Sequence, residues 1–333
     1  MALLSIIVPV YNVAPYLEEG LNSLLKQDLR DIEIICVDDK STDNSLQILQ
    51  KYSSLDNRLI LIQHNQNKGL SATRNTGIKN AKGKYIAFFD PDDSVESNMY
   101  SSMIRRMEED SCDIIMCGFR TFPDNHTVIP NFPTEPCSPY DFIRQNKKIH
   151  SSNDLCFSWR FLFKRQFLTE KKLSFIEEIR YAEDMVFNFN ALMQANRVTM
   201  LPQPLYNYRV NNPTSIMKQK YNPFMEDGLE RQVKEKRRII STYRVDSYTP
   251  ITMDMSEDII KRFTTMLFNN LWNNSQEVDK KKGVKRIINM PMIRKASQVV
   301  GFRNIYPSWK EYMFYLAIKF RISSLVYKLY FKS

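Results

Sequence analysis

Several features that would classify the chain at once are missing from its sequence. No stretch of the 333 residues repeats itself or falls into low complexity, which argues against a repeat protein. Of the three histidines, His64 ends the third predicted strand, and neither His126 nor His150 has a ligand-like partner at a recognisable spacing. A histidine-based metal or nucleophilic site is therefore not supported. Serine and cysteine nucleophiles likewise lack a base nearby in the sequence.

Paired cysteines and long apolar runs are absent as well. The five cysteines are an odd number, and none stands in a Cys-x-x-Cys pair, so we expect reduced, mostly structural thiols. The N-terminus lacks a basic leader and a small-residue cleavage site. Its apolar stretch therefore predicts a first strand, in a protein that stays in the reducing cytoplasm. No run approaches the roughly 18 apolar residues of a membrane span, which leaves only peripheral contact with a membrane.

Charge is distributed unevenly along the chain. The net charge is +10, yet residues 1–217 hold 24 Lys and Arg against 26 Asp and Glu, while residues 218–333 hold 23 against 11. The whole positive excess therefore lies in the C-terminal third, where it favours an anionic partner. With 43% hydrophobic and 25% charged residues, most of the chain is expected to fold, as one large domain or two modest ones.

Short apolar runs alternate with amphipathic segments along the first 120 residues or so. This rhythm predicts strands and helices in turn, which build a mostly parallel sheet covered on both faces. Residues from about 120 to 175 show no period and are expected to be irregular. The expected elements are Ser5–Val10, Tyr16–Gln27, Glu33–Asp38, Ser45–Tyr52, Leu59–His64, Leu70–Asn80, Tyr85–Asp90, Met99–Glu109 and Asp113–Gly118, and, after residue 220, the helices Glu226–Tyr243, Ser256–Asn270 and Trp309–Phe331.

Three carboxylates stand within four residues, Asp90, Asp92 and Asp93, directly after the apolar run 85–89. They would repel one another unless they were solvated, hydrogen-bonded or bound to a cation, and open parallel sheets bind ligands at such strand ends. One interpretation is a Mg²⁺ or Mn²⁺ site that takes its other ligands from substrate phosphates. The other is a solvated turn, since Asp and Pro are common turn formers. The tetrapeptide alone does not separate the two.

A second acidic cluster, Asp38 and Asp39, ends the second predicted strand and should lie at the same edge of the sheet. A carboxylate here can accept the N–H of a base such as uracil, and Asp39 is the better candidate. The neighbouring Asp43 is expected to cap the helix that follows.

Four blocks of the sequence form an ordered set: Ser5–Asn12, Val37–Asp43, Asn67–Gly77 and Gly83–Asp93. Together they resemble the signature of family 2 glycosyltransferases, strongly over residues 1 to about 120 and more loosely to about 215. The resemblance implies the GT-A fold, a Rossmann-like, mostly parallel α/β sheet with helices on both faces, followed here by a helical C-terminal region. It also implies a metal-dependent, inverting transferase with a DxD-type motif.

The resemblance assigns roles to individual residues on the donor side. The loop after the first strand would cradle the uracil of a UDP-sugar, and Asp39 would bond its base nitrogen. Arg74 matches an arginine placed near the nucleotide. Asp90 would hold the ribose side, while Asp92 would ligate the Mn²⁺ or Mg²⁺ ion, with Asp93 close by as the second metal candidate. The remaining donor-binding candidates are Pro9, Tyr11, Asn12, Asn67 and Gly69.

Two later segments also resemble family elements. Inverting transfer needs a general base, because the acceptor hydroxyl loses a proton as it attacks; Asp184 is the first candidate and Glu183 the second. In the segment 206–216, Arg209 and Ser215 would close over the pyrophosphate. Without the upstream blocks, the acidic pair is also explained as an ordinary first helical turn, and Arg209 as a solvent-facing residue at a strand end.

We therefore predict a hexosyl- or N-acetylhexosaminyl-transferase of the bacterial surface-polysaccharide type, which serves capsule, lipopolysaccharide or O-antigen synthesis on a glycan or lipid-linked glycan acceptor. The catalytic domain is expected over residues 1–218, with a nucleotide-sugar half to about 120 and an acceptor half from about 121, and a basic helical region over 219–333. No nucleic-acid partner is expected, and association into a homo-oligomer stays open.

The C-terminal segment from Trp309 to Lys332 mixes aromatic residues with cations and holds one acidic residue. This pattern favours an interfacial helix that contacts anionic lipids at the inner face of the cytoplasmic membrane. Helices packed on the catalytic domain or on another subunit explain it as well.

Two other classes of function also stay open: a nucleic-acid-binding protein with nuclease-like metal ligands, and a catalytically silent relative that only binds the nucleotide-sugar.

Overall fold

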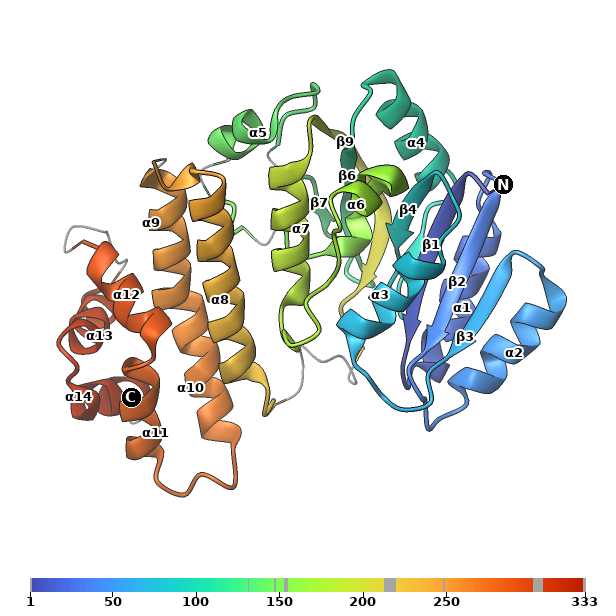
Figure 1. Cartoon of the computed structure of the whole chain (residues 1–333). Helices are drawn as coiled ribbons and strands as arrows, with labels where there is room; N and C mark the ends of the chain where they lie inside the picture. Colours follow the sequence, from blue (N-terminus) through green and yellow to red (C-terminus); the bar gives the residue numbers. More distant parts are fainter. Residues whose placement is uncertain are drawn as a thin grey trace. The chain divides into compact units, whose positions relative to one another are not determined.

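The computed structural model describes residues 2–130, 132–146, 148–152, 155–212, 220–247, 249–301 and 308–331. The chain forms two compact units (Figure 1). The sheet unit comprises Met1–Asn146 and Asp154–Pro213, and the helical unit comprises Lys147–Asn153 and Thr214–Ser333. Among the helices described, none has the length and apolarity that crossing a membrane requires.

One sheet forms the centre of the sheet unit. Its strands are β1 Leu4–Val10, β2 Ile32–Asp38, β3 Leu59–Gln63, β4 Tyr85–Phe88, β5 Ser94–Val95, β6 Ile114–Phe122, β7 Thr127–Val128, β8 Phe161–Lys164 and β9 Val198–Arg209. They follow the order β3-β2-β1-β4-β8-β6-β9-β5, with β7 paired to β6. The first four are parallel, and so are β6 and β9. β8 runs antiparallel between β4 and β6, so β4 and β6 point the same way.

Helices cover both faces of this sheet. They are α1 Ala14–Leu25, α2 Ser45–Leu55, α3 Leu70–Asn80, α4 Met99–Glu109, α5 Pro139–Gln145, α6 Arg165–Glu170 and α7 Glu183–Gln194, with a 3₁₀ turn η1 at Ser158–Arg160. The even residues of β1 are buried in a core with α1, α2 and α4. Ile7 faces the other way, where Gly77 of α3 packs so closely that a Cβ would overlap it. Cys36 belongs to the same core as the even residues, and none of the five cysteines forms a disulfide.

The predicted α/β alternation is confirmed, but the expectation of irregular structure from about 120 to 175 is wrong in part. β8 enters the middle of the sheet from this segment, and α5 and α6 come from it too. Four residues are too few to display a period. Phe161, Leu162 and Phe163 are buried, and Leu162 and Phe163 pair with strands on both sides. Burial and backbone pairing, not local pattern, therefore make this segment a strand.

The helical unit is built from helices, as expected. They are α8 Met225–Thr242, η3 Val245–Ser247, α9 Thr249–Asp258, the π-helical turn η4 Ile259–Phe263, α10 Thr264–Asn273, α11 Lys280–Ile288, α12 Pro291–Val299, α13 Trp309–Lys319 and α14 Ser323–Phe331. The single helix predicted over 309–331 is wrong, because Arg321 adopts a left-handed conformation (φ 61°) between α13 and α14. That residue ends one helix and lets the next begin.

Much of the aromatic surface of α13 and α14 faces inward. Phe314, Tyr330 and Phe331 surround Phe268 of α10, with ring centroids 6.0, 5.1 and 5.9 Å from it. The rings therefore stabilise a helical bundle. The expectation that this segment forms packed helices therefore accounts for these three side chains.

Candidate active site

The candidate residues gather at one edge of the sheet. β1, β2, β3 and β4 are parallel, so their carboxyl ends share an edge, and β6 and β9 end at the same edge. The chain runs from β1 outward to β2 and β3 and then returns to β4 on the other side of β1. Open α/β sheets bind ligands at such a switch point, because the loops diverge there.

The loops after β1 and β2 hold each other in place. Asn12, itself left-handed (φ 50°), accepts a hydrogen bond from Thr42 N through Oδ1 at 2.8 Å. Asp43 accepts bonds from the first backbone N–H of two helices, Ala14 N at 3.0 Å and Ser45 N at 2.9 Å. Asn44 and Val13 occupy the N-cap positions, but Asp43 thus supplies the capping bond predicted for α2, and one for α1 as well. These bonds fix the backbone of both loops.

Pro9 lies near the end of β1 and Tyr11 directly follows the strand, at the switch point. Phe89 N donates to Ile7 O, so the odd residues of β1 direct their backbone groups toward β4, and the pairing with β4 ends at Ile7. At Pro9 no strand remains on that side to accept an N–H. Proline has none, so no backbone donor is left unsatisfied there. The side chain of Tyr11 is 50% exposed and is open to a ligand.

Asp39 is buried beneath the loop that follows β3. Its carboxylate lies 2.7 Å from His64 Nδ1 and accepts bonds from Lys68 N and Gly69 N, both at 2.8 Å. Asn67 Nδ2 donates to Asp39 O at 3.3 Å. Gly69 has a φ of 89°, a conformation that side chains disfavour, and this lets the loop direct its N–H onto the carboxylate. Asp39 therefore organises the loop, and its bond to a uracil stays a prediction.

The acidic turn Asp90–Asp93 directs its last carboxylate into the core. Asp93 is 1% exposed, and both of its oxygens accept bonds, one from Tyr206 Oη at 2.8 Å and the other from Arg209 N at 2.7 Å. Burial raises the pKa of Asp93 well above its usual value, and the charges of the other two carboxylates act in the same direction. This side chain stabilises the turn from within.

Asp92 is the carboxylate of the turn that fits a divalent cation. It is partly exposed, and Asn212 Nδ2 donates to one of its oxygens at 2.6 Å. Mg²⁺ usually takes one or two protein carboxylates and completes its coordination with phosphates and water, which this arrangement allows. The described residues include no group of three or more side chains that could hold a metal by themselves. The predicted second ligand, Asp93, does not fit, because its oxygens are buried and bonded.

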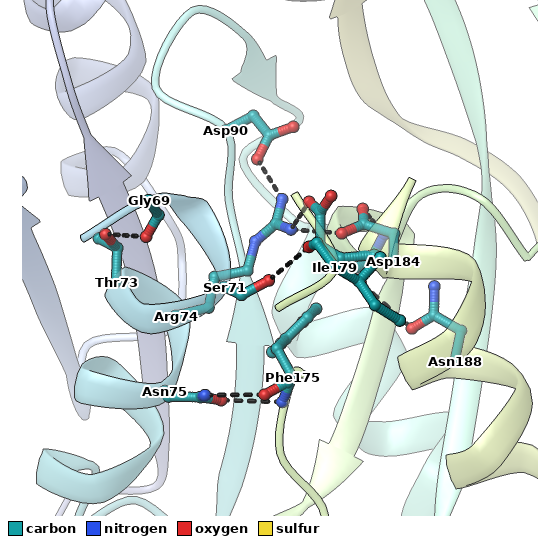
Figure 2. Close-up of polar contacts among 12 residues, drawn as sticks. Gly69, Ser71, Thr73, Arg74, Asn75, Asp90, Phe175, Ile179, Asp184 and Asn188 are labelled. Atoms are coloured by element: carbon teal, nitrogen blue, oxygen red, sulfur yellow. Dashed lines mark hydrogen bonds and ion pairs between the residues drawn. The ribbon is translucent and has the colours of Figure 1, made fainter. Parts of the chain in front are cut away.

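Arg74 joins the donor side of the site to the predicted base (Figure 2). Its guanidinium group, 1% exposed, contacts Asp184 and Glu183 through Nη1 and Asp90 through Nη2, the last two at 3.0 and 3.2 Å. Burial raises the pKa of Glu183, and it raises that of Asp90 to about 6, although Arg74 acts against both shifts. Three carboxylates around one cation thus leave an excess of negative charge, which favours protons and cations here.

Asp184 is held at the start of α7. Its second oxygen accepts a bond from Ser158 N at 3.0 Å, and Ser158 Oγ lies 3.2 Å from Asn188 Oδ1 one turn along the helix. Ala182, just before the helix, has φ 57° and ψ 38°, a left-handed conformation that is costly for a residue with a Cβ. Backbone strain of this kind is often found at functional sites. The direction of the acidic pair is therefore fixed by its surroundings.

Arg209 ends β9 and lies against the acidic turn. Its Nε donates to Asp92 O at 2.7 Å, and its Nη2 pairs with Glu19 at 2.5 Å. Two aromatic rings flank the guanidinium, with centroids at 4.8 and 4.9 Å, and the side chain is only 9% exposed. Arg209 thus forms part of the wall of the site. Ser215, its predicted partner in a closing loop, lies outside the described residues.

Three contributors to the site were not among the sequence-based candidates. Tyr206 Oη holds Asp93 and also accepts a bond from Asp90 N at 3.2 Å. His64 contacts the Asp39 carboxylate through Nδ1, while Ser158 holds the predicted base. None of the three carries a spacing that marks its role, because each approaches its partner from a distant part of the chain.

Comparison with known sequences points to a single family. The profile of glycosyl transferase family 2 matches residues 5–169. EpsJ, an uncharacterized glycosyltransferase of Bacillus subtilis, is 36% identical over 99% of this chain and 96% of its own length. TarS of Staphylococcus aureus, a poly(ribitol-phosphate) β-N-acetylglucosaminyltransferase, is 28% identical over 65% of this chain and 37% of its own length.

Two solved structures share the fold. The crystal structure of TarS 1–349 in complex with UDP-GlcNAc has a TM-score of 0.71 at 21% identity and covers 99% of this chain and 90% of that one. The mannosyltransferase PcManGT from Pyrobaculum calidifontis, in complex with GDP-Man and Mn²⁺, has a TM-score of 0.54 at 16% identity, with 99% and 88% covered. At these identities the likeness concerns the fold alone.

Proposed function

This chain belongs to glycosyltransferase family 2, and we propose that it moves a hexose or N-acetylhexosamine from a UDP-sugar to a glycan hydroxyl with inversion at the anomeric carbon. The observation that carries the proposal is the contact of one buried arginine, Arg74, with the donor-side carboxylate Asp90 and with the Glu183–Asp184 pair. Groups that act on two reactants must be held at a fixed distance and orientation. Arg74 supplies this by contacting the carboxylates of both groups.

The uridine of the donor would bind between the loops after β1 and β2. Tyr11 is exposed there, and Asn12 is fixed by its bond to the neighbouring loop. The complex of TarS with UDP-GlcNAc supports a uridine nucleotide and a hexosamine. Lys68 and Gly69, held by Asp39, would complete the wall on the β3 side.

Asp184 would act as the general base. The acceptor hydroxyl attacks the anomeric carbon as the bond to the diphosphate breaks, and its proton passes to the carboxylate while UDP departs. Arg74 pairs with Asp184 and keeps this carboxylate oriented. Glu183 is the alternative base, because its raised pKa suits proton transfer near neutral pH.

Asp92 would hold a Mn²⁺ or Mg²⁺ ion together with the diphosphate of the donor. Such an ion stabilises the negative charge on the departing UDP. The presence of Mn²⁺ beside GDP-Man in PcManGT supports this assignment. Arg209, bonded to Asp92 O, would add a fixed positive charge on the same side.

The acceptor would be a bacterial surface polymer. TarS acts on poly(ribitol-phosphate), and EpsJ, which matches along almost its entire length, is a bacterial glycosyltransferase. We extend this to polysaccharides of the cell surface, with capsule, lipopolysaccharide and O-antigen among them. The reaction would take place at the cytoplasmic face of the membrane.

One corner of the helical unit would bring the enzyme to a lipid-linked acceptor. Trp272 is 54% exposed and stacks on Phe331 at 5.1 Å, Val278 is 92% exposed, and Lys281 lies 5.8 Å from the ring of Tyr327. Apolar rings with cations beside them suit the boundary of anionic headgroups. Sedimentation with phosphatidylglycerol vesicles should weaken in a Trp272→Ala, Val278→Ser variant and persist in Trp309→Ala; equal binding by both would remove this corner from the proposal.

A donor panel tests the transferase proposal. UDP release is measured from UDP-glucose, UDP-galactose, UDP-GlcNAc and UDP-GalNAc, with Mn²⁺, with Mg²⁺ and with EDTA. We expect one donor to be preferred and EDTA to abolish turnover. Absence of UDP release and of any thermal shift with UDP and Mn²⁺, together with DNA binding that falls steeply with salt, would support the nucleic-acid alternative instead.

A further inference from the structure

Five aromatic side chains form one stack at the edge of the sheet unit where β6 and β9 end. Trp159 lies face to face with Tyr206 at 4.0 Å between ring centroids, and with Phe157 at 5.0 Å. Tyr208 lies 5.6 Å from Trp159 and 5.8 Å from Phe157. The ring of Phe119 meets Trp159 edge-on at 5.2 Å. We call these five residues the aromatic stack.

The aromatic stack is joined to both chemical parts of the site. Tyr206 Oη holds Asp93 of the acidic turn at 2.8 Å. Ser158 N, between two members of the stack, donates to Asp184 at 3.0 Å. In the order of the strands, the loops that follow β1 and β2 lie on one side of β4, and β8, β6 and β9 lie on the other. A molecule bound at the stack would thus approach the donor from the opposite side of the acidic turn.

Two members of the aromatic stack reach the surface. Trp159, Tyr206 and Phe119 are 1%, 0% and 7% exposed, whereas Phe157 and Tyr208 are half-buried. The pKa of Tyr208 is raised to about 12 by burial and by the charges of the three carboxylates in the acidic turn. On the same strand, Tyr206 and Arg209 on either side of Tyr208 both bond to Asp93 of the acidic turn. Together the two rings offer an apolar surface beside charged groups.

A pyranose ring matches such a surface. One face of the ring is lined by C–H groups, which pack against an aromatic ring, while its hydroxyl groups remain at the rim for water or for polar side chains. An open-chain polyol has no such face. We propose that Phe157 and Tyr208 form the acceptor subsite, on which the sugar ring that receives the transferred residue is stacked. The proposal rests on the transferase function above and specifies an acceptor that ends in a pyranose.

Saturation-transfer NMR on the full chain with UDP and Mg²⁺ tests this assignment. The probes are methyl β-D-glucopyranoside, methyl N-acetyl-β-D-glucosaminide and ribitol. We expect saturation of the ring protons of at least one glycoside and less for ribitol. Tyr208→Ala and Phe157→Ala should reduce that signal about fivefold, the loss expected for one aromatic contact of about 1 kcal/mol. Tyr208→Phe, which keeps the ring, should retain it, as should the control Tyr140→Ala, a residue of α5 that is 43% exposed.

The uracil protons of UDP serve as the internal reference in the same samples. Equal glycoside saturation in the wild type and both alanine variants, no glycoside signal in the wild type, or a ribitol signal that matches the glycosides would overturn the acceptor subsite. If UDP itself shows no saturation in the wild type, the proposed function fails first. Loss of the uracil signal in an alanine variant alone would mean that the aromatic stack only supports the fold.

Discussion

The two halves of the sheet edge are built by different means. On the β1–β3 side, short polar side chains such as Asn12, Asp39 and Asp43 bond directly to backbone N–H groups of neighbouring loops. On the β6–β9 side, stacked rings fix the position of Tyr206, whose hydroxyl group bonds to Asp93 of the acidic turn. Hydrogen bonds from a side chain to the backbone require particular residues at particular spacings. Packed rings can be replaced by many other combinations of apolar side chains of similar volume. The first half therefore carries the stronger motifs, and the segment 206–216 on the other half only a loose one.

The largest effect should come from the residue that lies where the two halves meet. Asp184→Asn keeps the shape of the side chain but cannot take the proton, so kcat should fall by about 10²–10⁴-fold. UDP affinity should change little, because the uridine would bind between the loops after β1 and β2. Steady-state transfer and a UDP thermal shift measure the two quantities. Glu183→Gln is the matched variant, and a larger loss there with near-normal turnover of Asp184→Asn would exchange the two roles.

The hydroxyl of Tyr206 tests whether the ring side supports the acidic turn. Tyr206→Phe leaves a buried oxygen of Asp93 and the N–H of Asp90 without their partner, so the free energy of unfolding should fall by about 2 kcal/mol. Tyr208→Phe removes a hydroxyl from a half-buried neighbour and should cost less than about 0.5 kcal/mol. Urea unfolding of both variants makes the comparison. Equal losses would show that the turn does not depend on this contact.

On the polar side, Asp43 carries two helix caps at once. Asp43→Ala removes the acceptor of Ala14 N and Ser45 N and should lower the free energy of unfolding by about 1–2 kcal/mol. Asp43→Asn offers one amide oxygen in place of the two that accept these bonds, so it should keep about half of this stabilisation. Partial burial works to raise the pKa of Asp43, but its hydrogen bonds outweigh that and lower it. The contribution is therefore present above the ordinary aspartate pKa and lost as the pH falls through the lowered value. A loss that is the same for Ala and Asn would contradict the capping role.

The smallest effect concerns how stability depends on pH. Burial raises the pKa of Asp90 to about 6 against the pull of Arg74, so the folded state binds this proton more tightly than the unfolded chain does. This proton therefore contributes fully to the free energy of unfolding below about pH 4, and the contribution is lost as the pH rises through about 6. Asp90→Asn should therefore gain about 1 kcal/mol relative to the wild type between pH 5 and 7. Urea unfolding of both proteins across this range measures it, and a constant difference would exclude a raised pKa.

Local pattern predicted the elements that the β1–β3 side needs. The helices 70–80 and 99–109 begin and end where expected, and β1 follows from an apolar run that is buried on both faces. β8 was not predicted, since four residues have no period and become a strand only between two others. The break at Arg321 was missed as well, because a left-handed arginine carries no local signal.

The residues by themselves determined the fold class, the helical character of the C-terminal third and the acidic clusters that follow β2 and β4, because periodicity and spacing encode these locally. Only the tertiary structure decided which carboxylates are exposed. Asp92 faces outward, while Asp93 and Asp39 are buried and bonded. It alone brought Arg74, Tyr206 and Ser158 to their partners. In two of these cases, burial and hydrogen bonding join groups that are more than a hundred residues apart in the sequence. A pattern of neighbouring residues cannot predict such a contact.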